Sequence, residues 1–338
     1  MSVRVGINGF GRIGRMVLRT ILKRHPNAID VAAINDITDV RTNAHLFKWD
    51  STYGPFEGEV TTEKNDFVVN GRKIMVFAER EPAAIPWNSV GAEIVVESTG
   101  LFTDANRAVS HREHGVKKVI ISAPAKNEDL TIVLGVNDHA YNPAVHHVVS
   151  NASCTTNGLA PVAKVLFDRF GIQKGLLTTI HSYTNSQKLQ DTAARDDLRD
   201  ARAAAENIVP SGTGAARAVG LVIPELQGRF HGMAFRVPTP TVSVVDFTAL
   251  LDRDATVEEV NAAVREYAEG PMKGILDYTE LPLVSCDLKG NPHSSIFSAL
   301  DTVAVGGNLV KVVAWYDNEW GYACRVADLI RFIADKGL

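Results

Sequence analysis

The amino-acid sequence predicts an α/β protein in two parts, a doubly wound parallel sheet followed by an α+β region with a mixed or antiparallel sheet. In the first half, short β-rich runs alternate with helical periods. From residue 229 to 251 and from 296 to 316, longer strands alternate apolar with polar residues. The length of 338 residues also exceeds what one hydrophobic core usually supports. We therefore expect one domain over 1–153 and a second over 154–319.

Strand and helix signals follow one another regularly in the first half. A strand is expected over Val3–Asn8, a helix over 12–25 and a second strand over 30–36. Further short β-rich runs lie at 93–100, 116–124 and 131–137. Strands that alternate with helices in this way favour parallel pairing.

The second half contains helix patterns among its long strands. After Cys154, apolar residues recur at helical spacing from Leu159 to Phe170, and Pro161 between them is best tolerated in a first turn. The segment 256–270 has a similar pattern. A helix over 320–338 is expected to pack back on the first domain.

Charge argues against a nucleic-acid partner. The net charge is −4 and the isoelectric point is near 6.2, so no basic stripe is available to neutralise phosphates. We expect no nucleic acid among the partners.

Cysteine content and hydropathy bear on the compartment. The three cysteines, at 154, 286 and 324, form no CxxC pair and suggest neither a disulfide framework nor a thiolate metal site. The start MSVRVGINGF lacks the features of a secretory signal, and no apolar run reaches about 18 residues. We expect a cytoplasmic protein that makes no contact with a membrane.

The first strand leads directly into a glycine motif with Gly9, Gly11 and Gly14, followed by a helix. In a Rossmann fold these glycines allow a tight turn, close approach of the backbone to a pyrophosphate, and close packing of helix on strand. Asp36 ends the second strand, 22 residues after Gly14, where a carboxylate can accept hydrogen bonds from a ribose 2′-hydroxyl. A glycine turn without a ligand is the alternative. A carboxylate repels a 2′-phosphate, so NAD is favoured and NADP is not excluded.

Cys154 lies within the polar stretch SNASCTTNG at the predicted start of a helix. Amide groups at a helix start and a nearby imidazole lower the pKa of a thiol. The polar neighbours suit an oxyanion or a phosphate better than a buried thiol. A small buried structural cysteine is the alternative reading.

A base for this thiol is available in His181, at the end of the apolar strand in LLTTIHSYTN. A structural histidine is the alternative at such a strand end. His111 and His114 in HREHG have charged neighbours and no third ligand, so we interpret them as a solvated helix end. We expect no metal.

Six motifs in one order give the chain a family resemblance. They are INGFGRIGR, SNASCTTN, HSYTN, RAAAENIVPSGTGAA, FRVPTPTVSVVD and WYDNEWGY. Together the chain resembles phosphorylating glyceraldehyde-3-phosphate dehydrogenases from residue 5 to its carboxyl end. The resemblance implies oxidation of D-glyceraldehyde 3-phosphate to 1,3-bisphosphoglycerate with NAD and inorganic phosphate.

The same resemblance implies roles for individual residues. Cys154 would be the nucleophile that forms a thiohemiacetal and then a thioester, with His181 as base. The implied phosphate-binding residues are Ser153, Thr155, Thr184, Thr213, Gly214 and Arg236. The implied cofactor-binding residues are Gly9, Gly11, Arg12, Ile13, Gly14, Asp36, Thr99, Ser122, Asn318 and Tyr322.

Family members are homotetramers, and the resemblance implies that the loop at about 182–206 reaches a neighbouring subunit's cofactor site. Arg236 also attracts attention by its chemistry, because it interrupts an otherwise apolar strand. An oxyanion partner would offset the cost of a guanidinium there, and a salt bridge to Asp or Glu is the alternative.

Several positions depart from the family pattern. Gly158 replaces a second cysteine that most members carry, so no disulfide to Cys154 forms within that helix. Thr192 and Ala193 stand near a Leu-Pro pair of NAD-specific members, which keeps dual cofactor use open. Arg217 replaces the usual Lys, and Gly212 replaces a Ser or Thr.

Two other functions remain open at this point. Erythrose-4-phosphate dehydrogenases share SNASCTTN but differ at the SYTN turn and carry Glu where Asp36 stands. The second is a redox sensor, or an RNA-binding module, that binds the dinucleotide without turnover.

Overall fold

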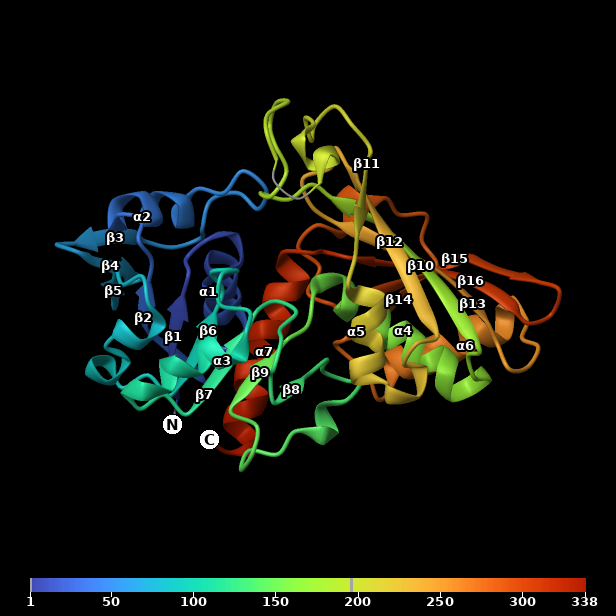
Figure 1. Ribbon diagram of the computed structural model, residues 1–338, viewed down its shortest axis with the longest axis horizontal. Coiled ribbons are helices and arrows are strands. Elements are labelled where there is room, and N and C mark those ends of the chain that lie inside the picture. The colour runs from blue at the N-terminus through green and yellow to red at the C-terminus, as the bar shows by residue number, and fades with distance from the viewer. Residues whose placement is uncertain (1, 195–196) are drawn as a thin grey trace. The chain divides into compact units, whose positions relative to one another are not determined.

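The computed structural model describes residues 2–194 and 197–338, which form two compact units. The first unit consists of the chain up to Ile132, His139–Ala152 and Ala323–Leu338. The second consists of Val133–Asp138 and Ser153–Tyr322. Each unit is built around one central sheet (Figure 1).

A nine-stranded sheet forms the centre of the first unit, in the order β3-β4-β5-β2-β1-β6-β7-β9-β8. Its strands are β1 Val3–Asn8, β2 Ile29–Asn35, β3 Val60–Glu63, β4 Asp66–Val69, β5 Arg72–Phe77, β6 Ile94–Glu97, β7 Lys118–Ile121, β8 Leu130–Thr131 and β9 Val148–Ser150. All neighbouring pairs are parallel except β3–β4 and β4–β5. The predicted parallel sheet is confirmed, and the antiparallel strands β3 to β5 at its edge were not expected.

The predicted strand over 131–137 is wrong beyond Thr131. Val133 N donates to Asn137 Oδ1 at 2.8 Å, and Gly135 N donates to Asp138 Oδ1 at 2.8 Å. Gly135 has φ of +81°, in the left-handed region that glycine adopts readily. Side-chain oxygens therefore close a turn in a segment whose apolar residues suggested a β-strand.

The helices of the first unit are α1 Arg12–Arg24, α2 Val40–Lys48 and α3 Ala105–Ala108, with short 3-10 turns η1 Pro82–Ala84, η2 Trp87–Val90 and η3 Val109–His114. A further 3-10 turn, η4, covers Asp138–Ala140. The C-terminal helix α7 covers Trp320–Lys336, and its residues from Ala323 belong to this unit. Thr20 Oγ1 donates to Ala323 O at 3.2 Å, and Arg24 pairs with Asp328 at 3.1 Å. These contacts hold α7 beside α1.

A seven-stranded mixed sheet forms the second unit, in the order β11-β12-β10-β13-β16-β15-β14. Its strands are β10 Lys174–Ser182, β11 Val209–Gly212, β12 Phe230–Val237, β13 Ser243–Leu250, β14 Leu276–Thr279, β15 Ser295–Val305 and β16 Leu309–Tyr316. Pairs β10–β12 and β14–β15 are parallel and the others antiparallel. This confirms the predicted mixed sheet.

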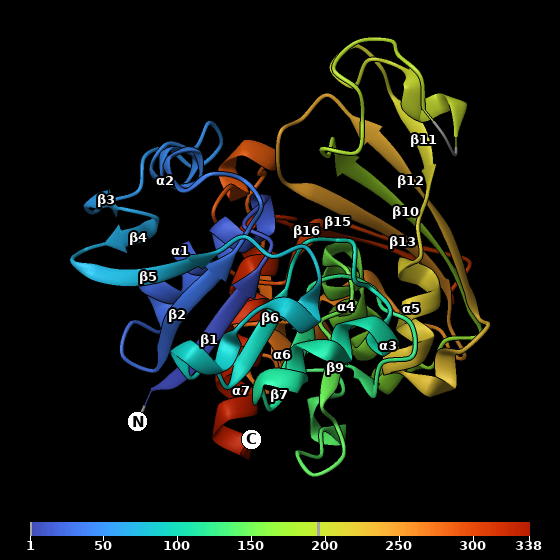
Figure 2. The ribbon, with the colours of Figure 1, turned by 60° about the vertical axis from the view of Figure 1, so that its left-hand side comes forward.

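Three helices accompany this sheet, α4 Cys154–Phe170, α5 Ala215–Val222 and α6 Val257–Glu269, with 3-10 turns η5 Leu198–Ala201, η6 Pro224–Leu226 and η7 Ser285–Leu288. Helix α4 contacts β13, β15 and β16 as well as α5 and α6. Figure 2 shows the three helices grouped along the strands.

Helix α4 starts at Cys154, with Ser153 as its N-cap. Ser153 Oγ accepts a hydrogen bond from Thr156 N at 3.0 Å. A proline ring is best tolerated in the first turn of a helix, but Pro161 lies further inside this one. Gly158 faces Tyr316, because a Cβ at position 158 would stand 2.9 Å from Tyr316 Cδ1.

The glycine loop after β1 is closed tightly. Gly9 has φ of +87°, and a Cβ on Gly14 would stand 2.2 Å from Gly9 O. Gly11, by contrast, has open space around a hypothetical Cβ. The first and last glycines therefore serve packing, and the middle one leaves the loop surface clear.

No helix within residues 2–194 and 197–338 is both long and apolar enough to span a membrane.

We expect Gly14→Ala to lower the free energy of unfolding by about 1 to 3 kcal/mol, because the new methyl group overlaps Gly9 O. Gly11→Ala is the matched control and should leave that free energy nearly unchanged without ligand. Urea unfolding of the two variants beside the original protein measures both. Equal stability of the two variants would contradict the packing argument.

Candidate active site

The amino end of α1 is prepared for an anionic ligand. Its N-cap, Gly11, provides no side-chain hydrogen bond to the first turn. The amide groups of Arg12 and Ile13, both partly exposed, begin the helix there. An uncapped helix start behind a glycine loop fits the pyrophosphate of a dinucleotide.

Asp36 follows β2 directly and lies against the same loop. Its Oδ2 accepts a hydrogen bond from Phe10 N at 2.7 Å, and its Oδ1 accepts one from Thr38 N at 2.8 Å. The carboxylate is partly exposed and retains lone pairs for a ribose hydroxyl. The position agrees with that expected from the sequence.

Thr99 and Ser122 follow the next two strands of the sheet. Thr99 N and Thr99 Oγ1 donate to Glu97 Oε1 at 2.9 and 2.5 Å. Ser122 Oγ donates to Glu97 O at 3.1 Å. Both residues thus stand at the carboxyl edge of the sheet, where ligands of such folds bind.

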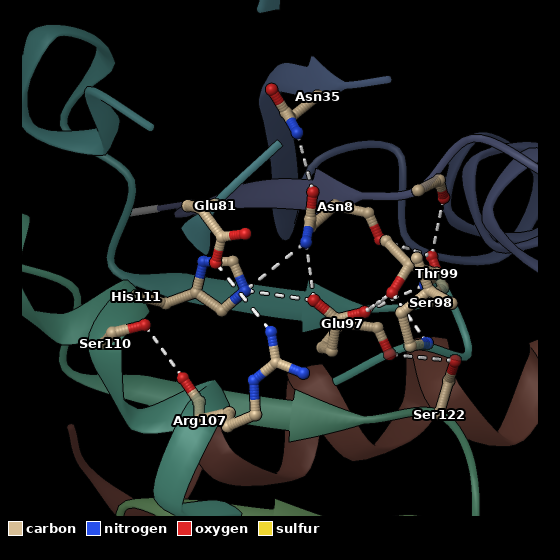
Figure 3. Close-up of polar contacts among 12 residues, drawn as sticks. Asn8, Asn35, Glu81, Glu97, Ser98, Thr99, Arg107, Ser110, His111 and Ser122 are labelled. Atoms are coloured by element: carbon tan, nitrogen blue, oxygen red, sulfur yellow. Dashed lines mark hydrogen bonds and ion pairs between the residues drawn. The ribbon is translucent and has the colours of Figure 1, made fainter. Parts of the chain in front are cut away.

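His111 lies in the interior of the first unit, so its interpretation as part of a solvated helix end is wrong. It is fully buried, with Trp87 Nε1 at 3.1 Å from Nδ1 and Glu97 Oε2 at 3.0 Å from Nε2. Figure 3 shows the contact with Glu97. His114 is partly buried, with Nε2 2.6 Å from Ala83 O. The charged residues next to these histidines suggested exposure to solvent, but the hydrogen-bond partners of both histidines are distant in sequence.

Cys154 and His181 are brought together in the second unit. Cys154 Sγ lies 3.5 Å from His181 Nε2. The thiol stands on the first residue of α4, and the imidazole at the end of β10 is 4% exposed. A nucleophile within reach of a base is the arrangement that covalent catalysis requires.

Opposing effects act on the two pKa values. Burial raises the pKa of the Cys154 thiol, while the charge of Arg236 and hydrogen bonds around Thr155 lower it. Burial is the largest effect, so the pKa of the thiol lies above its usual value, contrary to the sequence expectation. Burial, and then Arg236, lower the pKa of His181 to about 4. The free site therefore holds a neutral thiol beside a neutral imidazole at pH 7.

Arg236 reaches the same imidazole from β12. His181 and Arg236 are register partners in the parallel pair β10–β12. Arg236 Nη1 lies 2.6 Å from His181 Nδ1 and 3.4 Å from Ser182 O. Within the described part of the chain, no carboxylate pairs with this guanidinium, which leaves it available to an anionic ligand.

A buried hydroxyl group that sequence reasoning missed supports the site. Tyr316 OH lies 2.8 Å from Thr155 Oγ1 and 2.9 Å from Thr179 Oγ1. Burial raises the pKa of this phenol above its usual value. The Tyr316 ring meets the His181 ring edge-on, with 6.0 Å between centroids. Tyr316 is the second residue of the WYDNEWGY motif, which is the sequence signal that could have drawn attention to it.

Asn318 is oriented by a relay of hydrogen bonds. Ser182 N donates to Ser243 Oγ at 3.0 Å, and Ser243 Oγ donates to Asn318 Oδ1 at 3.0 Å. The amide oxygen is thereby occupied, which leaves the Nδ2 hydrogens as donors toward a ligand. Asp317 accepts hydrogen bonds from Glu319 N and Trp320 N and caps α7. Tyr322 is buried in the first turn of that helix.

The expected phosphate-binding residues occupy separate places. Ser153 Oγ caps α4, and Thr155 Oγ1 contacts Tyr316. Thr184 Oγ1 lies 2.9 Å from Ser186 Oγ in the turn after β10. Thr213 and Gly214 precede α5, whose N-cap lacks a side-chain hydrogen bond. No hydrogen bond joins Thr213 or Gly214 to Cys154 or His181 among the residues described.

Within the ranges that the structure describes, no three or more His, Cys, Asp or Glu side chains are arranged to hold a metal ion.

Comparison with known proteins identifies a family for a segment of each unit. Residues 3–105 match the family model of the glyceraldehyde 3-phosphate dehydrogenase NAD binding domain, and residues 153–318 match that of the C-terminal domain. Glyceraldehyde-3-phosphate dehydrogenase of Geobacillus stearothermophilus is 59% identical over the whole of both chains. Those of Priestia megaterium and, as enzyme 1, of Bacillus subtilis are each 57% identical over the whole of both chains.

These matches confirm the resemblance, the α/β fold class, NAD as cofactor and the class of NAD-dependent phosphorylating dehydrogenase. The chain belongs to the glyceraldehyde-3-phosphate dehydrogenase family.

Proposed function

We propose that the chain oxidises D-glyceraldehyde 3-phosphate to 1,3-bisphosphoglycerate, with NAD as hydride acceptor and inorganic phosphate as acyl acceptor. The observation that carries the proposal is the 3.5 Å contact between Cys154 Sγ and His181 Nε2 at the start of α4. In this proposal the dinucleotide binds to residues 1–153 together with helix 320–338. Residues 154–319 carry the catalytic groups.

The reaction begins with transfer of the thiol proton from Cys154 to His181 Nε2. The thiolate attacks the aldehyde carbon, and the imidazolium returns the proton to the oxygen, which gives a thiohemiacetal. Bound NAD supplies the acceptor for the hydride. As the hydride leaves, His181 Nε2 takes the hydroxyl proton and a thioester of Cys154 remains. Phosphate oxygen then attacks the thioester carbon, the C–S bond breaks, and Cys154 leaves as thiolate. The imidazolium returns its proton to this thiolate, which restores the neutral pair of the free site.

The second nitrogen of His181 decides whether Nε2 can act as base. With a hydrogen on Nδ1, the ring donates to Ser182 O at 2.7 Å and presents a lone pair at Nε2. Arg236 Nη1, at 2.6 Å from Nδ1, is a donor and favours the opposite tautomer. We therefore assign Arg236 to the phosphate of the substrate, because turning to that phosphate frees Nδ1 to donate to Ser182 O.

The remaining residues take the roles that the family pattern implies. Thr184 joins Arg236 at the substrate phosphate, and Ser153, Thr155, Thr213 and Gly214 bind inorganic phosphate. Asn318 donates to the nicotinamide carboxamide, and Tyr322 packs nearby. The glycine loop, Asp36, Thr99 and Ser122 hold the rest of the cofactor.

The proposal extends to assembly and location. The enzyme acts as a cytoplasmic homotetramer without nucleic-acid or membrane partners. The loop at about 182–206 reaches the cofactor site of a neighbouring subunit, and Arg195 and Asp196 of this loop lie outside the described residues.

We expect NADH formation from glyceraldehyde 3-phosphate to require inorganic phosphate, and Cys154→Ser to reduce its rate by roughly 10⁴-fold or more. NAD affinity should stay within about twofold, since the variant removes only the nucleophile. Absorbance of NADH measures the rate, and titration calorimetry measures the affinity. Cys286→Ser, at an exposed cysteine, is the matched control.

Three results would contradict this mechanism. Substantial oxidation by Cys154→Ser would exclude the covalent step. Oxidation of erythrose 4-phosphate without a phosphate requirement would favour the related dehydrogenase. Binding of NAD without any aldehyde oxidation would favour a redox sensor.

We expect Arg236→Leu to move the alkylation of Cys154 by iodoacetamide to higher pH, because the Arg236 charge lowers the pKa of the thiol. In the original protein the imidazole, with its pKa of about 4, is neutral between pH 7 and 10, and burial remains the larger cause of its low pKa when Arg236 is removed. Alkylation is followed by mass spectrometry across that range. Arg236→Lys should retain most of the effect and Thr184→Val should show no shift. A shift to lower pH in Arg236→Leu would contradict the conclusion that the Arg236 charge lowers the pKa of the thiol.

We expect Asp36→Ala to raise the preference for NADP over NAD by about tenfold, the equivalent of roughly 1.4 kcal/mol of charge repulsion. The ratio of kcat/KM for the two cofactors measures this preference. Asp30→Ala, at the other end of β2, should leave the ratio unchanged. An unaltered ratio in Asp36→Ala would place cofactor discrimination elsewhere, such as at Thr192 and Ala193.

A further inference from the structure

We propose that Glu97 is the positioning residue of the dinucleotide site, and that its carboxylate fixes the ends of β1, β2 and β6 through directed hydrogen bonds. The inference rests on the proposed cofactor roles of the loops that start at Gly9, Asp36 and Thr99. None of the catalytic steps uses Glu97, and the sequence motifs did not single it out.

Four donors converge on this buried carboxylate. Oε2 accepts from Asn8 Nδ2 at 2.5 Å and from His111 Nε2 at 3.0 Å, and Oε1 accepts from the Thr99 amide and hydroxyl at 2.9 and 2.5 Å. The side chain of Glu97 is 1% exposed. No Lys or Arg pairs with it among the described residues. A buried charge of this kind is tolerated only because each oxygen is hydrogen-bonded.

The charge belongs to Glu97 and not to His111. Trp87 Nε1 lies 3.1 Å from His111 Nδ1, and an indole nitrogen can only donate. Nδ1 must therefore present a lone pair, which places the single ring hydrogen on Nε2, toward Glu97. A second hydrogen on the ring would oppose the indole N–H, so His111 acts as a neutral donor.

The direction of each further hydrogen bond follows from this charge. Asn8 turns its amide nitrogen to Glu97, so its oxygen faces Asn35 Nδ2 at 2.8 Å (Figure 3). Asn35 Oδ1 in turn accepts from Glu79 N at 2.8 Å. Asn8 is the register partner of both Asn35 and Glu97, each the last residue of its strand. One carboxylate thereby sets the exits of three strands.

The charged side chains near this network make contacts of their own and do not bind the Glu97 carboxylate. Glu81, beside η1, and Arg107 on α3 pair with each other at 3.8 Å, and both side chains are largely exposed. His114 on η3 contacts Ala83 O. The buried network consists of neutral donors around one anion.

A glutamine at position 97 cannot reproduce the pattern. Its amide nitrogen would face either the two donors from Asn8 and His111 or the two from Thr99. Either orientation sets donor against donor at two contacts. Asn8→Asp sets acceptor against acceptor, because two carboxylates then face each other.

The double variant Asn8→Asp with Glu97→Gln reverses the central hydrogen bond. The new amide group at position 97 would then donate to the carboxylate at position 8, which still accepts from Asn35, and Thr99 keeps its acceptor at Oε1. One buried negative charge is retained. Only the contact with His111 remains unfavourable.

The test is titration calorimetry of NAD binding to the cofactor-free protein, with thermal unfolding measured in parallel. We expect Glu97→Gln and Asn8→Asp each to weaken NAD binding by about tenfold or more. The double variant should bind more tightly than either single variant. Glu93 precedes the same strand and pairs with Lys117 at the surface. The control variant Glu93→Gln should therefore bind NAD as tightly as the original protein does.

The outcomes separate this inference from the proposed function. If neither the original protein nor Glu93→Gln binds NAD, the proposed function is contradicted. NAD binding by Glu97→Gln at the original affinity, at a temperature where it is folded, would overturn the positioning role. If a single variant does not fold, recovery of folding and binding by the double variant supports the role, and its failure to recover overturns it.

Discussion

Parallel pairing of neighbouring strands is the constraint on which both units depend. Because parallel strands end at the same edge, side chains far apart in sequence meet there. In the first unit the shared edge collects Asn8, Asn35 and Glu97. In the second unit, the parallel register of β10 and β12 sets His181 beside Arg236. Hydrogen-bonding side chains then convert the shared edge into a site with defined donors and acceptors.

Local patterns predicted most of the framework. The strand Val3–Asn8, the glycine loop and the helix that starts at Arg12 agree with the sequence expectation, because these elements are specified by adjacent residues. The same holds for α6, where Thr256 and Glu259 form a capping box. Cys154, His181 and Arg236 were predicted as site residues because polar side chains interrupt apolar strands or begin a helix. Their proximity to one another, however, needed the register.

The errors arose where distant partners overrule local composition. His111 was placed at a solvated end because of its charged neighbours, but Trp87 and Glu97 hold it in the interior. The apolar letters after Thr131 suggested a strand, yet Asn137 and Asp138 close a turn with their side chains. Burial of Cys154 also outweighs the effect of its helix start on the thiol pKa. Each of these outcomes depends on contacts that no sequence window contains.

The close packing of Gly158 on Tyr316 bears on how the Cys154 thiol responds to oxidants. Where a second thiol occupies that position, a sulfenic acid on the nucleophile has a partner one helical turn away. Here the aromatic ring fills that space, and the other two cysteines of the chain are at 286 and 324. A sulfenic acid on Cys154 therefore has no partner thiol at position 158. Unless another thiol reduces it, an oxidised Cys154 can proceed to the irreversible steps of oxidation.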